Sequence, residues 1–193
     1  METKELPNRK NCRLYGYDYS TCGNYFITIV TKNRCNMFGH IENGIMQPNS
    51  AGKMVYNVFT GVNEYNKGVM VNDIVIMPNH IHCIITLTTN TGIGLSAIMR
   101  YIKSKTTVEY IHGVNKYGWK RFDGNLWQQR YYDHVIRNQR IYDLIRNYIF
   151  HNPERWNKDK LNLSCTDNAD DIGLMIKQYE QNGQIQEYVP TMK

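Results

Sequence analysis

The sequence lacks any run of about 18 consecutive apolar residues, the length that a helix needs to cross a membrane. No apolar segment follows its polar first residues, so a secretory signal is not expected. No Cys-x-x-Cys pair occurs among its five cysteines. This odd and scattered set indicates neither a disulfide framework nor a cysteine zinc site. The expected compartment is therefore a reducing cytoplasm, with no membrane partner.

The 193 residues are enough to bury the core of one domain without disulfides, and 41% of them are hydrophobic. Lysine and arginine number 23 against 17 acidic residues, which gives a formal net charge of +6. Fifteen tyrosines accompany this charge. Cationic and aromatic side chains together suit single-stranded nucleic acid, although most tyrosines are equally expected to rim a core.

Hydrophobic periodicity and turn residues predict an α+β fold. Strands are expected at residues 25–31, 69–77, 80–87 and 127–136, with a hairpin-like excursion at 37–47. Helices are expected at 50–66 with Ser50 as N-cap, at 95–111, at 138–150 and at 170–181, with a glycine- and lysine-rich loop at 112–126. This order is that of the ferredoxin-like β-α-β-β-α-β fold, an antiparallel sheet backed by helices, followed by a C-terminal helix and tail.

Composition divides the chain into three parts. Residues 1–23 form a basic, tyrosine-rich N-terminal arm, residues 24–156 the folded domain, and residues 157–193 a polar C-terminal tail. The tail carries no motif and is expected to be a flexible or capping segment.

Two histidines stand two residues apart in the strand predicted at 80–87. Because side chains alternate between the faces of a strand, His80 and His82 point the same way. Two imidazoles in this arrangement can bind one divalent cation. Two structural or surface histidines are the alternative, and the spacing alone does not decide between them.

A second pair lies near the end of the helix predicted at 138–150. Tyr148 and Asn152 are four residues apart, so they share one helix face. Asn152 could offer its side-chain oxygen to a metal, beside which the Tyr148 hydroxyl would stand. A core tyrosine and an asparagine that caps the helix before Pro153 are the alternative.

Several motifs occur together, and in this combination the sequence resembles the single-tyrosine transposases of the HUH superfamily, most closely the REP-associated tyrosine transposases. The resemblance covers roughly residues 9–156. Its motifs lie at residues 17–34, 38–52, 75–82, 95–107, 127–137 and 148–153. Residues 75–82 are similar to the strand that carries the family's two histidines, and residues 148–153 to its tyrosine helix.

The resemblance implies a metal-dependent endonuclease and strand transferase of single-stranded DNA. By position, His80 and His82 would bind Mg²⁺ or Mn²⁺, with Asn152 as the third protein ligand. Tyr148 would attack the scissile phosphate, form a 5′-phosphotyrosine and release a 3′-hydroxyl, without a nucleotide cofactor. Insertion-sequence members usually have glutamine in place of Asn152, and the Asn-Pro version is similar to the REP-associated branch, which argues against self-mobility.

Cations and aromatic residues outside these pairs are candidate contacts for single-stranded or hairpin DNA. They are Arg9, Lys10, Arg13, Lys103, Lys105, Lys116, Trp119, Lys120 and Arg121, with a solvated surface as the alternative for each. His134 is a candidate for a supporting position next to the metal ligands, or for sheet packing. The resemblance further implies a bacterial, nucleoid-associated protein that could form a homodimer.

Another function on the same fold would be a domesticated protein that binds hairpin nucleic acid without turnover. A replication initiator or plasmid-transfer enzyme of the same superfamily fits less well. The chain is short, has no helicase region and offers one tyrosine with an asparagine four residues later.

Overall fold

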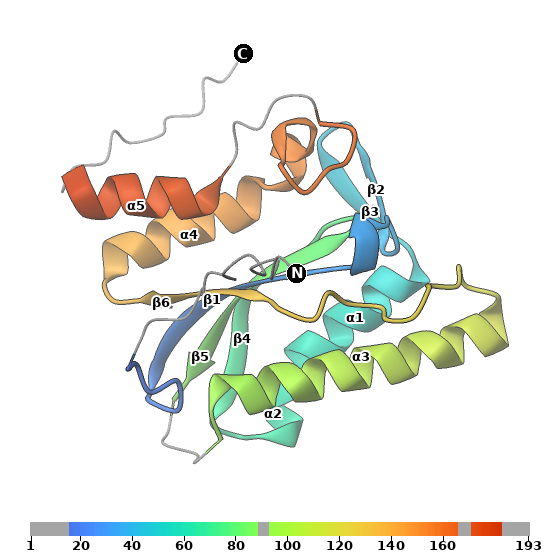
Figure 1. Ribbon diagram of the computed structural model, residues 1–193, viewed down its shortest axis with the longest axis horizontal. Coiled ribbons are helices and arrows are strands. Elements are labelled where there is room, and N and C mark those ends of the chain that lie inside the picture. Colours follow the sequence, from blue (N-terminus) through green and yellow to red (C-terminus); the bar gives the residue numbers. More distant parts are fainter. Residues whose placement is uncertain (1–15, 89–92, 166–170, 183–193) are drawn as a thin grey trace, which may run out of the picture.

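A four-stranded antiparallel sheet forms the centre of the computed structural model, which describes residues 16–88, 93–165 and 171–182 (Figure 1). The strand order is β4-β5-β1-β6. The strands are β1 (Gly23–Val30), β4 (Val69–Ile76), β5 (His80–Leu87) and β6 (Tyr132–Ile136). Arg9, Lys10 and Arg13 of the predicted arm lie outside the described residues.

The sheet separates two hydrophobic cores because side chains alternate along its strands. In β5, Ile81, Cys83 and Ile85 belong to one core, whereas Ile84 belongs to the other. His82 is opposite Thr28 of β1 in the ladder and stacks on Phe26, a member of the second core. The two histidines therefore lie on the face of the sheet that this second core covers.

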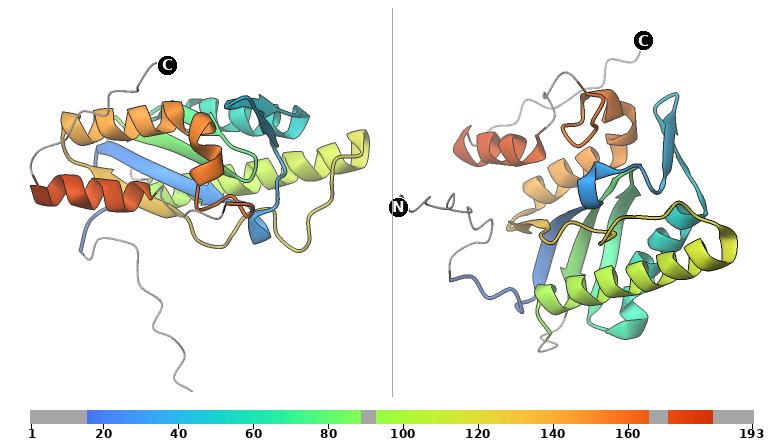
Figure 2. Two further views of the ribbon diagram at one scale, coloured as in Figure 1. Left: turned by 90° about the horizontal axis from the view of Figure 1, so that it is seen from above. Right: turned by 45° about the vertical axis from the view of Figure 1, so that its right-hand side comes forward.

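Helices cover both faces of the sheet (Figures 1 and 2). The first core packs under α1 (Ser50–Thr60), α2 (Val62–Tyr65) and α3 (Leu95–Tyr117). The second core packs under α4 (Gln139–His151) and α5 (Ile172–Asn182). With the sheet order, this arrangement confirms the predicted α+β, ferredoxin-like fold with an additional C-terminal helix.

A small hairpin follows β1 and the short turn η1 (Lys32–Arg34). Its strands are β2 (Gly39–Glu42) and β3 (Ile45–Pro48), as the excursion at 37–47 predicts. Asn43 and Gly44 join them with φ values of 50° and 76°. Two positive φ angles are typical of a type I′ turn, which the Asn-Gly sequence favours.

The helix predicted at 50–66 differs in two respects from the structure. Its N-cap is Asn49 rather than Ser50, because Oδ1 of Asn49 accepts a hydrogen bond of 2.9 Å from the Gly52 amide. It also ends at Thr60, and Gly61 separates it from the single turn of α2.

The helix predicted at 95–111 continues to Tyr117, so six residues of the predicted loop at 112–126 are helical. Gly113 lies inside this extension, against the indole ring of Trp119. The helix ends where Gly118 adopts a φ of 68°. The strand predicted at 127–136 is also shorter, since only Trp127 bridges to Thr31 before β6 begins at Tyr132.

The segment after α4 turns back over the sheet. A 3₁₀ segment, η2 (Pro153–Lys158), follows α4 directly, and α5 confirms the helix predicted at 170–181. Ile172 and Ile176 of α5 are buried in the second core. The described part of the tail is therefore packed against the domain.

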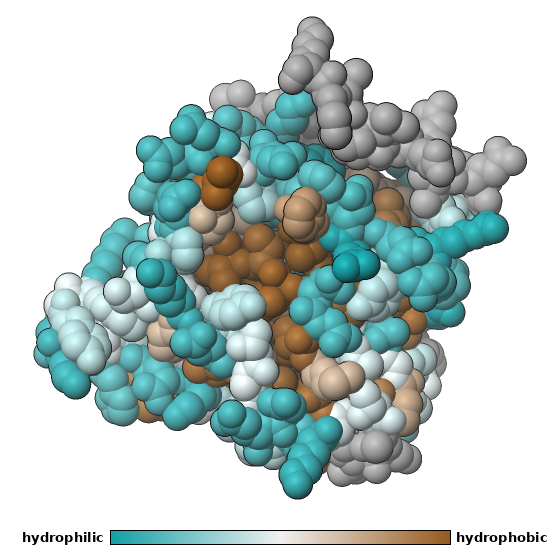
Figure 3. All heavy atoms as spheres, turned by 180° about the vertical axis from the view of Figure 1, so that it is seen from behind, coloured by the Kyte–Doolittle hydropathy of each residue, from teal (hydrophilic) through white to brown (hydrophobic). Residues whose placement is uncertain are grey.

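The face behind that of Figure 1 carries α1, β4 and α4 (Figure 2) and has apolar residues gathered in its middle (Figure 3). β4 is an edge strand of the sheet, and its register is interrupted between Val71 and Ile74. None of the helices in the described part of the chain has the length and apolar character that a bilayer-spanning helix needs.

Candidate active site

The imidazoles of His80 and His82 lie side by side under α4, with ring centroids 4.6 Å apart. As strand alternation predicts, both point to the same face of β5. Both side chains are buried, with 0% and 2% of the residue exposed. The arrangement brings two nitrogen donors together in the interior of the protein.

Asn79 fixes the orientation and the tautomer of His80. The Asn79 amide nitrogen donates to the carbonyl oxygens of Arg34 (3.1 Å) and Leu161 (2.8 Å). Its Oδ1 therefore faces Nδ1 of His80, at 2.8 Å, and can only accept a hydrogen bond. The proton of His80 is then on Nδ1, which leaves a lone pair on Nε2.

His82 is held from the neighbouring strand. Its Nδ1 lies 2.7 Å from the hydroxyl oxygen of Thr28, its partner in the ladder. The ring also stacks on Phe26, with centroids 5.5 Å apart. These contacts aim Nε2 of His82 at the space between the sheet and α4.

α4 brings Tyr148 and Asn152 to the two histidines. The helix begins after Asn138, whose side chain accepts a hydrogen bond from the Ile141 amide and so caps the first turn. The Tyr148 hydroxyl lies 3.5 Å from Nε2 of His82. Tyr148 and Asn152 are 4% and 1% exposed, so both face the sheet, as their spacing of four residues predicts.

Asp159 joins this group from the predicted tail, and sequence reasoning missed it. Its Oδ2 lies 3.5 Å from Nε2 of His80. One ligand atom each from His80, His82 and Asp159 lie within 4.8 Å of one another. The only local signal was an acidic residue shortly after the Asn-Pro pair, and nothing in that pattern distinguishes it from a surface aspartate.

Burial controls the charge of the two imidazoles. It lowers the pKa of His80 to about 3, against a smaller opposing effect from the Asn152 amide next to the ring. Burial lowers the pKa of His82 well below its usual value, and repulsion from His80 when that ring is protonated and from the Lys160 charge lowers it further. Both rings are therefore neutral near pH 7, the form that binds metal.

The donor set fits a divalent cation. Among the described residues, Nε2 of His80 and Oδ1 of Asn152 are buried polar atoms with no hydrogen-bond partner. Buried polar atoms normally have a hydrogen-bond partner, so two buried atoms without one at the same place indicate a site that binds a ligand. Two imidazole nitrogens with amide and carboxylate oxygens suit Mn²⁺ and, with bound water, Mg²⁺.

A cavity of about 260 Å³ reaches part of this group of residues. Its lining includes Thr28, His82, Tyr148 and Asp159. A second hollow of about 580 Å³ adjoins it, because Gln128 and Arg130 line both. The cations along these two hollows are Lys32, Arg34, Arg130 and Lys160. None of these four was among the predicted DNA contacts.

Among the described residues that line the histidine cavity, none is a DNA contact predicted from the sequence. Lys103 donates to the carbonyl oxygens of Gln128 (2.7 Å) and Gln129 (3.2 Å), so it is next to a residue that lines this cavity. Lys105 pairs with Glu109 at 2.7 Å. The remaining candidates are at the far end of α3 and in the loop after it: Lys116, Trp119, Lys120 and Arg121.

His134 lies on β6, opposite Phe26 and two residues along the strand from Tyr132. Its Nε2 is 3.9 Å from a carboxylate oxygen of Glu180 in α5. Burial lowers its pKa, and the nearby Glu180 opposes this. Tyr132, not His134, is the β6 residue that lines the histidine cavity.

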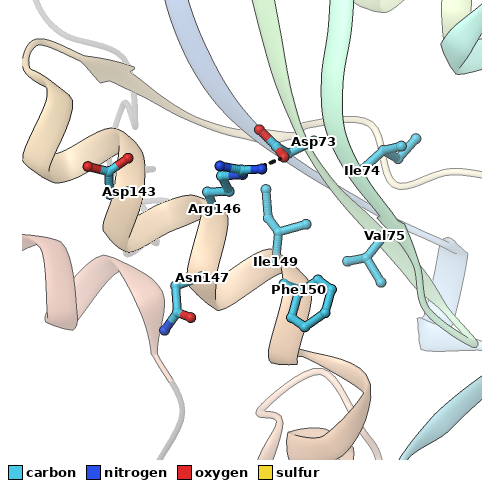
Figure 4. A pocket seen from close by; sticks show the side chains of 8 residues that line it. All are labelled: Asp73, Ile74, Val75, Asp143, Arg146, Asn147, Ile149 and Phe150. Carbon is cyan, nitrogen blue, oxygen red and sulfur yellow. Dashed lines mark hydrogen bonds and ion pairs between the residues drawn. The ribbon is translucent and has the colours of Figure 1, made fainter. Parts of the chain in front are cut away.

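A separate cavity of about 520 Å³ lies between α4 and the edge strand β4. Figure 4 shows Arg146 reaching from α4 to Asp73, while Ile149 and Phe150 lie near Val75. The Arg146 and Asp73 side chains approach to 3.2 Å. The described residues around this cavity include neither histidine nor Tyr148, so it is distinct from the candidate site.

Comparison with known proteins assigns the chain to a family. The family model described as "Transposase IS200 like" matches residues 19–152, which contain both histidines, the tyrosine and the asparagine. The chain belongs to the IS200-like transposase family. Members of this family are enzymes that cut and join DNA. The match ends before Asp159, so that residue comes from outside the region that the family model describes.

This transposase is also similar to individual proteins over part or most of its length. An uncharacterised protein of Haemophilus influenzae is 33% identical over 169 residues, which cover 81% of this chain and 94% of that protein. A REP-associated tyrosine transposase of Escherichia coli is 35% identical over 83 residues, 43% of each chain. The structure of a REP-associated tyrosine transposase bound to a REP hairpin matches with a TM-score of 0.50 and 25% identity, covering 73% of this chain and 70% of the other.

Proposed function

We propose that this transposase cuts and rejoins single-stranded DNA beside a hairpin, with Tyr148 as the nucleophile and a divalent metal held by His80, His82 and Asn152. The observation that carries the proposal is the position of the Tyr148 hydroxyl, 3.5 Å from Nε2 of His82 in a buried site. The hairpin comes from the related structure, which was solved with a REP hairpin bound.

Each residue has a separate task in this proposal. Thr28 and Asn79 orient the rings of His82 and His80 through their Nδ1 atoms. When bound, Mg²⁺ or Mn²⁺ supplies positive charge that polarises the scissile phosphate. α4 holds the Tyr148 oxygen next to that place, so the attack needs little reorganisation.

The reaction is balanced without a further reactant. The Tyr148 oxygen forms a bond to phosphorus as the bond from phosphorus to the 3′ oxygen breaks. The phenol gives up its proton, and the departing 3′ oxygen takes one from solvent, which leaves a 5′-phosphotyrosine and a 3′-hydroxyl. Attack by another 3′-hydroxyl reverses these changes and joins the strands, so the bond energy is conserved.

A gel assay for covalent protein–DNA adducts tests the proposal. Labelled hairpin oligonucleotides with single-stranded flanks would be mixed with the protein and Mn²⁺, or with EDTA. We expect an adduct that needs Mn²⁺ and is absent in Tyr148→Phe. Tyr142→Phe is the matched control, because Tyr142 is on the same helix but bonds to Asp73 instead, at 3.0 Å.

The results separate the two functions considered from the sequence. Adducts that persist in Tyr148→Phe would refute this tyrosine as the nucleophile. Hairpin binding without an adduct in the wild-type protein would instead indicate a domesticated binding protein that has lost turnover.

A homodimer is a second part of the proposal, and the face that carries α1, β4 and α4 supports it. Two cavities on this face share Ile74 and Val75 of the edge strand. Phe150, which lines one of them, is 75% exposed. An edge strand beside apolar surface is a place where chains associate. Sedimentation of the wild-type protein and of Phe150→Ser tests this, with a concentration-independent monomer as the contrary result.

A further inference from the structure

Backbone hydrogen bonds hold Asp159 in a buried position. It follows η2, where its amide donates to the Trp156 carbonyl oxygen at 3.1 Å. Its Oδ1 accepts a hydrogen bond from the Leu161 amide, at 2.6 Å. The residue is 2% exposed. The carboxylate is thereby fixed with Oδ2 directed at Nε2 of His80.

Three contacts hold the turn of residues 159–161 against the rest of the fold. Asn79 donates to the Leu161 carbonyl oxygen at 2.8 Å, and Nη1 of Arg34 donates to that of Lys160 at 3.1 Å. The Lys160 ammonium is 2.6 Å from a carboxylate oxygen of Asp171. The residue that orients His80, Asn79, is therefore also the residue that positions the turn carrying Asp159.

His80 and Asp159 turn two acceptor atoms toward each other. Asn79 keeps the His80 proton on Nδ1, so Nε2 presents a lone pair to a carboxylate oxygen 3.5 Å away. A cation placed between these two atoms would be bound by both. Adjacent ligands of an octahedral cation at about 2.1 Å are about 3 Å apart, close to the separation observed here.

We propose that Asp159 is a ligand of the same metal as His80 and His82, so that the site contains a carboxylate contributed from beyond the matched family region. The proposal rests on the proposed function of this site. A carboxylate neutralises part of the charge of a divalent cation and, unlike an amide oxygen, attracts it by full charge. Asp159 should therefore increase the affinity for Mn²⁺ and Mg²⁺ in the absence of DNA.

Calorimetric titration with Mn²⁺, without DNA, tests this on the full chain. Asp159→Asn has nearly the same shape and keeps an acceptor for the Leu161 amide. We expect its affinity for Mn²⁺ to fall by about 10-fold or more, a loss typical of weakened metal sites. Asp123→Asn removes the same charge from an exposed loop and should bind as the wild-type protein does.

A second measurement does not depend on how the variant folds. In the wild-type protein, the carboxyl ¹³C signal of Asp159 should shift when Mg²⁺ is added, whereas that of Asp123 should not. Thermal unfolding in EDTA shows whether Asp159→Asn is folded before the titrations are compared.

The outcomes distinguish this inference from the function on which it rests. Equal Mn²⁺ affinity in wild type and Asp159→Asn, with binding lost in His80→Ala, would overturn the role of Asp159 and leave the metal site intact. A wild-type Asp159 signal that does not respond to bound Mg²⁺ would overturn it as well. Absence of Mn²⁺ binding in the wild-type protein would overturn both.

Discussion

The Tyr148 hydroxyl and Nε2 of His82 lie 3.5 Å apart, although 66 residues separate them in the sequence. One comes from α4 and the other from β5, and Phe26 packs against both rings, with centroid separations of 6.4 Å and 5.5 Å. The candidate nucleophile and the candidate metal ligand are thus fixed by the same apolar core. Changes in that core or in the contacts behind the rings should therefore affect both.

Thr28→Val should weaken metal binding without removing any proposed ligand. Valine has the shape of threonine but cannot hold Nδ1 of His82, which lies 2.7 Å from the hydroxyl. We expect a fall of about 10-fold in Mn²⁺ affinity and a loss of about 1 kcal/mol in the free energy of unfolding. Calorimetry and urea denaturation measure the two effects.

Thr86→Val is the control for this prediction, because Thr86 also makes side-chain hydrogen bonds across the sheet but to Asn24 and Asn72. It should leave Mn²⁺ affinity unchanged. The same affinity loss in both variants would show a general effect on the sheet instead of an effect on His82.

Asn79→Ala should destabilise the protein more than most single changes. It leaves the carbonyl oxygens of Arg34 and Leu161 and Nδ1 of His80 without the partner they have in the structure. Each buried unsatisfied group costs about 1–3 kcal/mol, and the two carbonyl oxygens can regain water, so a total loss of about 2–4 kcal/mol is expected. Urea denaturation in EDTA measures it, and a loss below about 0.5 kcal/mol would contradict the role of Asn79.

Lys103 should make stability depend on pH in the alkaline range. Burial lowers its pKa from 10.5 to about 8 in the folded protein. Between these values the unfolded chain keeps a proton that the folded protein has lost, so stability rises with pH relative to Lys103→Met. The slope should be below about 1 kcal/mol per pH unit, because Lys103 is only partly buried.

Urea denaturation of both proteins at pH 8 and pH 10 tests this dependence, and an NMR titration of the Lys103 side chain gives its pKa directly. The prediction is contradicted if the stabilities of the two proteins change with pH in parallel and the pKa of the Lys103 side chain is near its ordinary value.

Gly113→Ala should destabilise the end of α3 although alanine favours helices. A Cβ atom at this position would overlap the indole ring of Trp119. We expect a loss of about 1–3 kcal/mol, typical of overpacking, and a change in tryptophan fluorescence. Ser104→Ala, at an exposed position of the same helix, should change neither by a comparable amount. An unchanged or increased stability in Gly113→Ala would show that the loop after α3 moves freely.

Local patterns were enough to predict the order of elements and the shared face of the two histidines. Alternation along β5 places His80 and His82 together whatever else the chain does, and a spacing of four residues does the same for Tyr148 and Asn152. The end of the helix predicted at 95–111 was wrong because a side-chain packing contact decides it. Gly113 resembles a helix breaker in the sequence, but Trp119 packs on it and α3 continues to Tyr117.

Asp159 and the cations near the site could not be found in this way. The position of Asp159 depends on Asn79, 80 residues earlier, and on a turn fixed by Leu161. Lys103 is predicted as a phosphate contact from its charge alone, whereas its hydrogen bonds to two carbonyl oxygens appear only in the structure. A sequence shows which side chains are charged, but the tertiary fold determines what each of them contacts.

The contacts of Asn79 also become possible at different times while the chain is synthesised. Arg34 and Asn79 emerge from the ribosome early, but Leu161, the third member of this connection, emerges 82 residues after Asn79. A growing chain can therefore pair β1 with β5 while Tyr148 and the turn of residues 159–161 are still to be made. The proposed metal site, with Asp159 among its ligands, can be completed only after translation has passed Leu161.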